Sequence, residues 1–327
     1  MRSKSNFAIK GENMSFAKDV KMQILNVPIE DDCCRFAFLS GLLRACGEYD
    51  EKTQKMSFTT DMEKACEFVN GLFKSLYRTE AELETADGFK IHKTNYYKAT
   101  LPPAYTHQML TDFGLIEPTG EFSIDKLDES IFECDNCRRA FLKGMFLGCG
   151  TSGIRLDDPQ RTTTGYDVEF VSKSHDLLQA TAEVLAHFDI SPRCVKRKNH
   201  FVLYIKESGQ VSDILALVGA HDSVIKLQDE LSLRELRNKI NREVNCEKAN
   251  ISKVVEASVR QTQAINIISD RIGLSELPDD LQEVALLRLA NPEESLDELL
   301  NLSLTKLTKS ALYHKFKKLE KIAKNLE

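Results

Sequence analysis

The chain has 327 residues, of which 42% are hydrophobic, and its 44 Lys and Arg against 50 Asp and Glu give a formal net charge of −6. At roughly 100–200 residues per domain the length predicts two or three domains, and the apolar content excludes disorder as the overall state. No apolar run approaches the roughly 18 residues that cross a bilayer, the start shows no signal-peptide pattern, and the cysteines lack framework spacing. We therefore expect a protein of the reducing cytoplasm.

An internal repeat organises the chain up to about residue 222. Residues 35–47 align without gaps on residues 138–150 at an offset of 103, and seven of the 13 positions are identical. After each copy the hydrophobic periodicity predicts the same order of one strand, one helix and two further strands. The expected ranges are 55–60, 62–76, 82–85 and 95–101 after the first copy, and 166–171, 175–188, 193–198 and 200–205 after the second. After a polar tail at 1–13, we assign one half-domain to residues 14–115 and the other to 116–222.

From about residue 223 the pattern is helical throughout. Candidate helices cover residues 231–241, 252–268, 278–290, 295–302 and 309–324. We divide this region into a helical linker at 223–250 and a domain at 251–327. Residues 276–298, the acidic block, carry eight acids and one Arg, whereas residues 306–324 carry seven lysines and one Glu. Because like charges repel, we expect the acidic block to face away from any DNA that the lysines contact.

Each copy of the repeat places a glycine inside a helix that is otherwise rich in Leu, Phe and Ala. Gly41 and Gly144 each cost their helix about 0.5–1 kcal/mol relative to Ala, so close approach of two helix backbones is the expected compensation. The two helices would then pack about an internal pseudo-two-fold axis. Duplex DNA is the commonest ligand with matching two-fold symmetry.

Residues 39–47 and 142–150 resemble two copies of the LAGLIDADG motif of homing endonucleases. The resemblance implies an α+β fold of two αββαββα halves and, at the eighth motif position, an acid that holds the catalytic metal. That position is Cys46 in the first copy and Cys149 in the second. Glu48 follows Cys46 closely, but the second copy has no matching acid. Thiols replace the hard oxygen ligands of Mg²⁺ poorly, so we predict no catalytic residues and no nuclease activity.

Two pairs of cysteines precede the two motifs, Cys33 with Cys34 and Cys134 with Cys137. A zinc site would need all four thiols at one tetrahedral centre. A single Cys-x-x-Cys is a weak signal, and the pattern alone does not bring the two helix starts together. The favoured interpretation is therefore reduced thiols, without a bound metal or cofactor.

The last two candidate helices indicate a helix-turn-helix. Ser295 followed by Glu298 has the pattern of a capping box, and Thr308 is a second N-cap candidate. The final helix is expected to bury four residues, Leu312, Phe316, Leu319 and Ala323. Its opposite face offers the groups that a major-groove helix uses, although a solvated amphipathic helix would look similar. The predicted DNA-binding residues are Lys306, Thr308, Lys309, Ser310, Tyr313, His314, Lys317, Lys318 and Lys321.

An inactive LAGLIDADG pair joined to this helix-turn-helix resembles the WhiA family of Gram-positive bacteria. The similar segments are residues 14–21, 244–250, 277–281, 288–292 and 308–320. The resemblance implies a non-catalytic, sequence-specific binder of double-stranded DNA in the cytoplasm at the nucleoid. It implies transcription regulation in cell division and chromosome segregation, or in sporulation for part of the family. A WhiB-type iron–sulfur partner is implied for the actinobacterial branch only, and the lysine-rich bias favours a low-GC source.

Two other classes of function are open on the residues alone. One is a scaffold whose duplicated domain contacts a second regulatory protein and whose DNA binding is weak. Basic residues on the expected sheets, such as Lys196 and Arg197, are more often solvated than bound to DNA. The other is a residual metal-dependent endonuclease that depends on Glu48. No membrane partner is expected.

Overall fold

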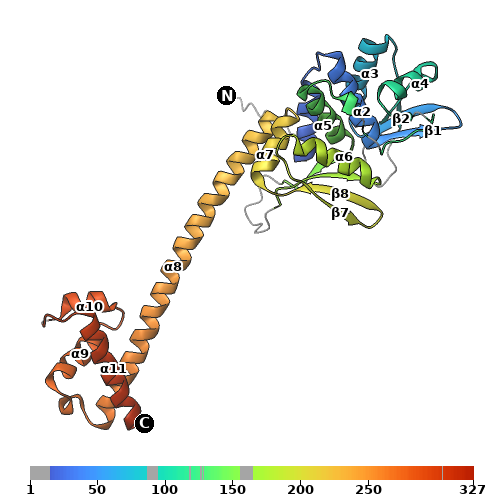
Figure 1. The fold of residues 1–327 in the computed structure, drawn as a ribbon. Helices are drawn as coiled ribbons and strands as arrows, with labels where there is room; N and C mark the ends of the chain where they lie inside the picture. Colours follow the sequence, from blue (N-terminus) through green and yellow to red (C-terminus); the bar gives the residue numbers. More distant parts are fainter. Residues whose placement is uncertain are drawn as a thin grey trace, which may run out of the picture. The chain divides into compact units, whose positions relative to one another are not determined.

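The computed structural model describes residues 15–86, 95–117, 119–125, 127, 129–154, 165–303 and 305–327. The chain divides into two compact units, Met1–Leu231 and Ser232–Glu327 (Figure 1). The predicted polar tail at 1–13 lies outside the described residues. Within the described part of the chain, every helix is too short or too polar to cross a bilayer.

The first unit contains one arrangement of helices and strands twice, after the helix α1 (Phe16–Asn26). The first copy consists of α2 (Asp32–Cys46), β1 (Gly47–Asp50), β2 (Lys55–Thr60), α3 (Glu63–Tyr77), β3 (Glu82–Ala86), β4 (Tyr96–Thr100) and α4 (Pro103–Asp112). The second consists of α5 (Asp135–Cys149), β5 (Gly150–Ser152), β6 (Val168–Ser172), α6 (His175–Ala186), β7 (Arg193–Arg197), β8 (His200–Ile205) and α7 (Ser208–Leu217). A 3-10 turn, η1 (Glu129–Ile131), lies between them. Both copies follow the order αββαββα, so the predicted duplicated α+β fold is confirmed.

Each copy forms a four-stranded antiparallel sheet with the same topology. The strand orders are β1-β2-β4-β3 and β5-β6-β8-β7. The first strand of each sheet begins at the glycine that ends the repeated motif, which places Gly47 opposite Phe58 and Gly150 opposite Phe170. The periodicity missed β1 and β5, because strands of four and three residues are too short to show a two-residue alternation.

Helices α2 and α5 lie side by side in the middle of the first unit (Figure 1). A Cβ atom at Gly41 would overlap the Phe141 carbonyl oxygen, and one at Gly144 would overlap the Phe38 carbonyl oxygen. The two contacts join equivalent positions of the two copies, so the helices run parallel. The two glycines are therefore what allows the helix backbones to touch.

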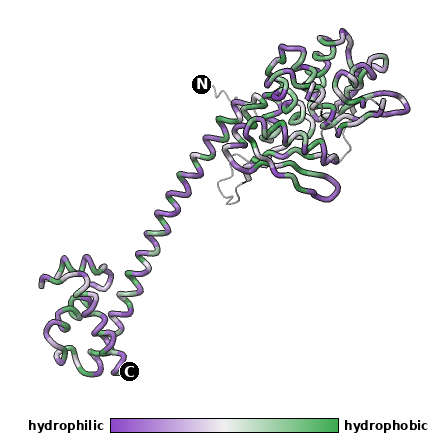
Figure 2. Tube along the Cα trace, in the orientation of Figure 1, coloured by the Kyte–Doolittle hydropathy of each residue, from purple (hydrophilic) through white to green (hydrophobic). Residues whose placement is uncertain are grey.

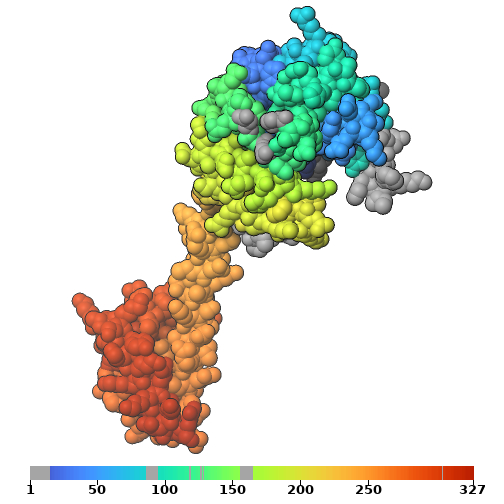
Figure 3. Space-filling model, turned by 45° about the vertical axis from the view of Figure 1, so that its right-hand side comes forward, coloured from blue at the N-terminus to red at the C-terminus, as the bar shows by residue number. Residues whose placement is uncertain are grey.

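The second unit has its own apolar core. It is built by the carboxyl-terminal part of α8 (His221–Arg271) and by the elements that follow. These are η2 (Leu274–Glu276), α9 (Asp279–Ala290), α10 (Leu296–Leu302) and α11 (Lys309–Leu326). Core residues from each helix include Ile265, Val284, Leu299 and Phe316. Figure 3 shows α11, in red, packed against the other helices of this unit.

Helix α8 corrects one expectation from the sequence. Separate helices were predicted at 231–241 and 252–268, but the structure has one helix of 51 residues, which also contains the predicted linker at 223–250. Residues 221–271 contain neither Gly nor Pro, so no residue in this stretch interrupts the backbone hydrogen bonding. The middle of α8 is largely hydrophilic (Figure 2), and apolar residues there, such as Ile240 and Ile251, are exposed. The weak apolar pattern explains why the sequence suggested two helices.

Candidate nucleic-acid interface

Two capped helices form the predicted helix-turn-helix. The Ser295 hydroxyl accepts the Glu298 N–H at 3.3 Å, and the Glu298 carboxylate accepts the Ser295 N–H at 2.7 Å, which completes the capping box of α10. The Thr308 hydroxyl accepts the Ala311 N–H at 3.2 Å at the start of α11. Each side chain satisfies a backbone donor that the first helical turn leaves unpaired. The two caps are therefore confirmed.

The buried and exposed faces of α11 divide as its spacing predicts. The four residues expected in the core are at most 3% exposed: Leu312, Phe316, Leu319 and Ala323. The structure places every predicted DNA-binding residue on the surface: Lys306, Thr308, Lys309, Ser310, Tyr313, His314, Lys317, Lys318 and Lys321. The face is therefore available to a large ligand.

Some lysines of this region already have acidic partners. Lys309 Nζ lies 2.5 Å from Asp297, and Lys317 Nζ lies 2.6 Å from Glu320. The remaining lysines of the predicted set form no ion pair within 4.0 Å among the described residues: Lys306, Lys318 and Lys321. These three ammonium groups are the ones that can neutralise phosphate charge without first breaking an ion pair.

Two residues of the acidic block contact lysines of α11, so part of this block lies beside that helix. Asp280 pairs with Lys315, and this contact lowers the pKa of Asp280. Asp297 pairs with Lys309 at the start of α11. At contact distance the attraction between opposite charges favours this arrangement within the unit.

Arg288 holds the helix-turn-helix together, a role that the sequence analysis did not assign. Its Nε donates to the Gln261 amide oxygen at 3.0 Å, and one terminal nitrogen donates to the Glu294 carbonyl at 2.7 Å. The guanidinium carbon lies 5.3 Å from the centre of the Phe316 ring, on the buried face of α11. Burial lowers the pKa of Arg288. The only available signal was a single arginine in a stretch of acids, which does not predict burial.

The degenerate motif positions lie at the carboxyl ends of α2 and α5. Burial raises the pKa values of Cys46 and Cys149 to about 12, so both thiols are protonated at neutral pH. Lys21 of α1 lies close enough to interact with both thiols, and burial lowers its pKa. A cavity of about 300 Å³ is lined by Lys21, Cys46 and Asp61, among others. This region therefore offers a cation, neutral sulfur and the single carboxylate of Asp61, where a magnesium site would need several carboxylates.

Glu48 does not restore a symmetric pair of acids. It lies on β1 opposite Ser57 and is exposed. The matching position on β5 is Thr151, opposite Glu169. The Glu169 carboxylate is already paired with Arg197 at 3.0 Å.

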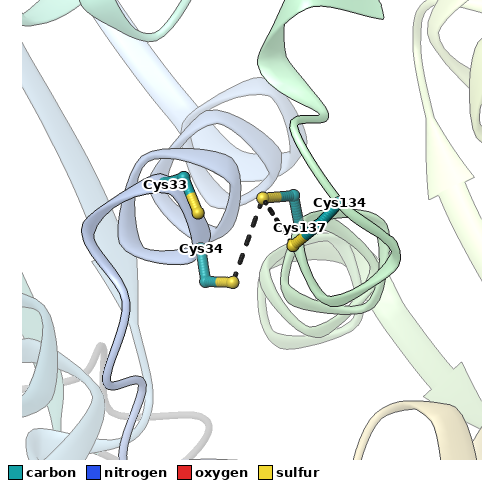
Figure 4. A group of neighbouring side chains, drawn as sticks. All are labelled: Cys33, Cys34, Cys134 and Cys137. Carbon is teal, nitrogen blue, oxygen red and sulfur yellow. Dashed lines mark hydrogen bonds between the residues drawn. The ribbon is translucent and has the colours of Figure 1, made fainter.

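The structure brings the two cysteine pairs together, which the sequence pattern did not predict. The sulfur atoms of Cys33, Cys34, Cys134 and Cys137 all lie within 4.8 Å of one another (Figure 4). The reason is the parallel packing of α2 and α5, which places the first turns of both helices at the same end of the pair. Cys34 and Cys137 are separated by 103 residues, the offset of the repeat, and that match was the available signal.

Comparisons with known proteins agree with this architecture. Three family models match the chain: the WhiA N-terminal LAGLIDADG-like domain at residues 32–116, the WhiA LAGLIDADG-like domain at 138–237 and the WhiA C-terminal HTH domain at 240–323.

Full-length relatives are also similar. A probable cell division protein WhiA of Clostridium botulinum is 33% identical over 319 residues, which are 96% of this chain and 99% of the relative. That of Alkaliphilus metalliredigens is 33% identical over 316 residues, 95% of this chain and 98% of the relative. The crystal structure of full-length WhiA from Thermotoga maritima has a TM-score of 0.56 at 27% identity and covers 95% of this chain and 99% of its own. The chain therefore belongs to the WhiA family.

Proposed function

We propose that this chain is a sequence-specific binder of double-stranded DNA that places α11 in the major groove. The observation that carries the proposal is the exposed polar face of α11 within a helix-turn-helix unit that matches the family's HTH model. Ser310, Tyr313 and His314 lie near the amino end of α11, where side chains of a recognition helix meet base edges. Lys318 and Lys321 lie further along the same face and supply charge for phosphate.

In this proposal the duplicated domain does not cleave DNA. Hydrolysis of a phosphodiester with Mg²⁺ needs oxygen ligands at both motif ends. Cys46 and Cys149 are neutral thiols, and Lys21 adds positive charge beside them, which disfavours a divalent cation. Glu48 is a single exposed acid. We expect Glu48→Gln to change neither DNA binding nor DNA integrity.

The cellular role in the proposal is transcription regulation linked to cell division and chromosome segregation. The support is the similarity to the relative from Clostridium botulinum, which is named probable cell division protein WhiA. The expected location is the cytoplasm, at the nucleoid of a Gram-positive-type bacterium. Sporulation control, by the resemblance, belongs to only part of the family.

The test uses the purified full-length protein, sheared host genomic DNA, near-physiological salt and Mg²⁺, followed by sequencing of the bound fragments and their ends. Enrichment of fragments that share one motif, with random ends, is the expected result. Absence of enrichment contradicts sequence-specific binding. Fragment ends that cluster at one sequence contradict the non-catalytic part of the proposal.

Variants of α11 separate base reading from phosphate contact. His314→Ala is expected to change the preferred sequence, with a loss of about 1–3 kcal/mol at one base position. Lys318→Ala is expected to weaken binding to all duplexes. It should also reduce the slope of log affinity against log salt concentration by about one. Lys253→Ala is the control, because it removes an exposed lysine of α8 and leaves α11 intact. If both α11 variants behave like the control, α11 is not the recognition helix.

A scaffold function of the duplicated domain is the second candidate. The supporting observation is that basic side chains of β7 are already engaged within their own sheet. Arg197 is paired with Glu169 at 3.0 Å, and Lys196 Nζ lies 5.6 Å from the centre of the Phe201 ring. This surface would then contact a second regulatory protein. DNA binding that disappears at physiological salt would favour this candidate.

A further inference from the structure

Four cysteine sulfurs meet at the amino ends of the two motif helices (Figure 4). Cys33 and Cys34 lie in the first turn of α2, Cys134 is the N-cap of α5, and Cys137 lies in the first turn of α5. The sulfur of Cys137 lies 3.9 Å from that of Cys34 and 3.5 Å from that of Cys134. All four sulfurs lie within 4.8 Å of one another, and they point into the space between the two helices.

These distances fit four ligands of a single tetrahedral ion. A Zn–S bond of about 2.3 Å places the sulfurs of a tetrahedral site about 3.8 Å apart. The two distances at Cys137, 3.5 and 3.9 Å, lie on either side of that value. A disulfide would need a sulfur separation of about 2.05 Å. A polynuclear iron–sulfur cluster distributes its cysteines over separate irons and spaces their sulfurs more widely.

Positive electrostatic groups lie beside the four sulfurs. The positive ends of two helix dipoles point at the sulfurs. The Lys143 ammonium of α5 interacts with Cys34 and offsets negative charge there. Cys34 and Cys137 are buried, and a bound divalent cation would offset the cost of burying their thiolates.

We propose that Cys33, Cys34, Cys134 and Cys137 bind one Zn²⁺ ion as a structural tetrathiolate site. Four cysteines at one closed tetrahedral centre are a structural rather than a catalytic donor set, because no coordination position remains for water or substrate. The site does not include the degenerate motif positions Cys46 and Cys149, which lie at the opposite ends of α2 and α5. It departs from the interpretation of the cysteines as thiols without a metal.

The ion would cross-link the two halves of the duplicated domain. Cys34 and Cys137 correspond to each other in the repeat, whereas Cys33 corresponds to Asn136 and Cys134 to Asp31. Each half therefore supplies one equivalent ligand and one ligand of its own. Binding requires both halves to be docked, so the metal's binding energy adds to the stability of the α2–α5 contact. This role is independent of DNA binding by α11.

The experiment measures zinc in the full-length protein after purification without chelators. The double variant Cys33→Ser/Cys134→Ser removes the two less buried ligands, so it disturbs the core least. Its matched control is Cys194→Ser/Cys246→Ser, which removes one partly buried and one exposed cysteine elsewhere. We expect about one zinc per chain in the parent and control, and below about a tenth in the double variant.

A second readout distinguishes tetrahedral thiolate binding from metal held elsewhere. Co²⁺ in place of Zn²⁺ is expected to give the visible absorption of a tetrahedral thiolate complex in the parent and control only. A chelator should lower the melting temperature of the parent and leave that of the double variant unchanged. If the double variant does not fold, Cys134→Ser alone should fold and show a shifted Co²⁺ spectrum.

Three outcomes would overturn the proposal. One is zinc-free protein in which all four cysteines react as thiols and added Zn²⁺ does not bind. Another is a disulfide between Cys134 and Cys137 in place of metal, detected by mass spectrometry without reductant. The third is a zinc content that the double variant retains, which would mean that the ion is bound elsewhere on the chain.

Discussion

Gly41 and Gly144 allow α2 and α5 to touch because glycine has no Cβ atom. A Cβ at Gly144 would lie against the Phe38 carbonyl oxygen and the Leu42 nitrogen, both in the backbone of α2. Backbone atoms in a packed helix cannot move aside as the end of a side chain can. Gly71, in α3, has no atom within 4 Å of the position where its Cβ would be, so it provides an internal comparison.

Gly144→Ala is expected to destabilise the first unit by about 1–3 kcal/mol or more, because the added methyl group forces the two helices apart. Gly71→Ala is expected to stabilise it by about 0.5–1 kcal/mol through higher helix propensity. Urea denaturation of the two variants measures both effects. Midpoint shifts in the same direction would contradict the close-approach explanation of the motif glycine.

Buried thiols at Cys46 and Cys149 predict a loss of stability at alkaline pH. Their native pKa of about 12 lies above the ordinary value of 9.0. Between these values the unfolded thiols release protons that the native thiols keep, so the free energy of unfolding falls as pH rises. Cys46→Ala/Cys149→Ala should reduce this fall in urea titrations at increasing pH. Cys246→Ala, at an exposed cysteine, should behave like the parent, and equal slopes for all three proteins would refute the assignment.

At the scale of helices, the orientation of α11 depends on neighbours from three other segments. Arg288 of α9 stacks on Phe316 and donates to Gln261 of α8. Asp297 of α10 is paired with Lys309 of α11. The first contact positions the buried face of α11, whereas the second partly neutralises its exposed face before any ligand binds.

Asp297→Asn is expected to strengthen DNA binding by up to about fivefold, since an exposed ion pair is worth about 0–1 kcal/mol and must be given up when Lys309 contacts phosphate. The salt dependence of binding should steepen at the same time. Glu276→Gln makes the same charge change at an exposed acid of η2. Equal affinities of the two variants in fluorescence anisotropy would show that net charge, not the pair, limits binding.

At the scale of the whole molecule, the two units have separate apolar cores. Phe170 lies in the core of the first unit and Phe316 in that of the second, and each is at most 1% exposed. No residue belongs to both cores among those that the structure describes. Units with separate cores are expected to unfold separately.

Calorimetry is therefore expected to resolve two transitions. Phe170→Ala should destabilise the first unit by about 3–5 kcal/mol and so lower the melting temperature of one transition. Phe316→Ala should destabilise the second unit by a similar amount and lower the melting temperature of the other transition. Duplex DNA should raise the melting temperature only of the transition that Phe316→Ala affects, because a ligand stabilises the unit that binds it. One transition that responds to both substitutions would contradict independent unfolding.

The sequence by itself determined the features that depend on neighbours along the chain. Period and spacing predicted the helices and the longer strands of each copy and the buried face of α11, whereas the full αββαββα order followed from the resemblance. The hydroxyl side chains of Ser295 and Thr308 predicted the amino-terminal caps of α10 and α11. These features follow from backbone geometry within one or two turns.

Only the tertiary structure decided which distant side chains meet. The contact of Cys34 with Cys137 spans 103 residues and that of Lys315 with Asp280 spans 35. The hydrophobic period along the chain predicts neither contact, because each contact depends on how whole helices pack. A candidate metal site, a buried arginine and an acidic block that pairs with α11 therefore emerged only when the helices were placed against each other.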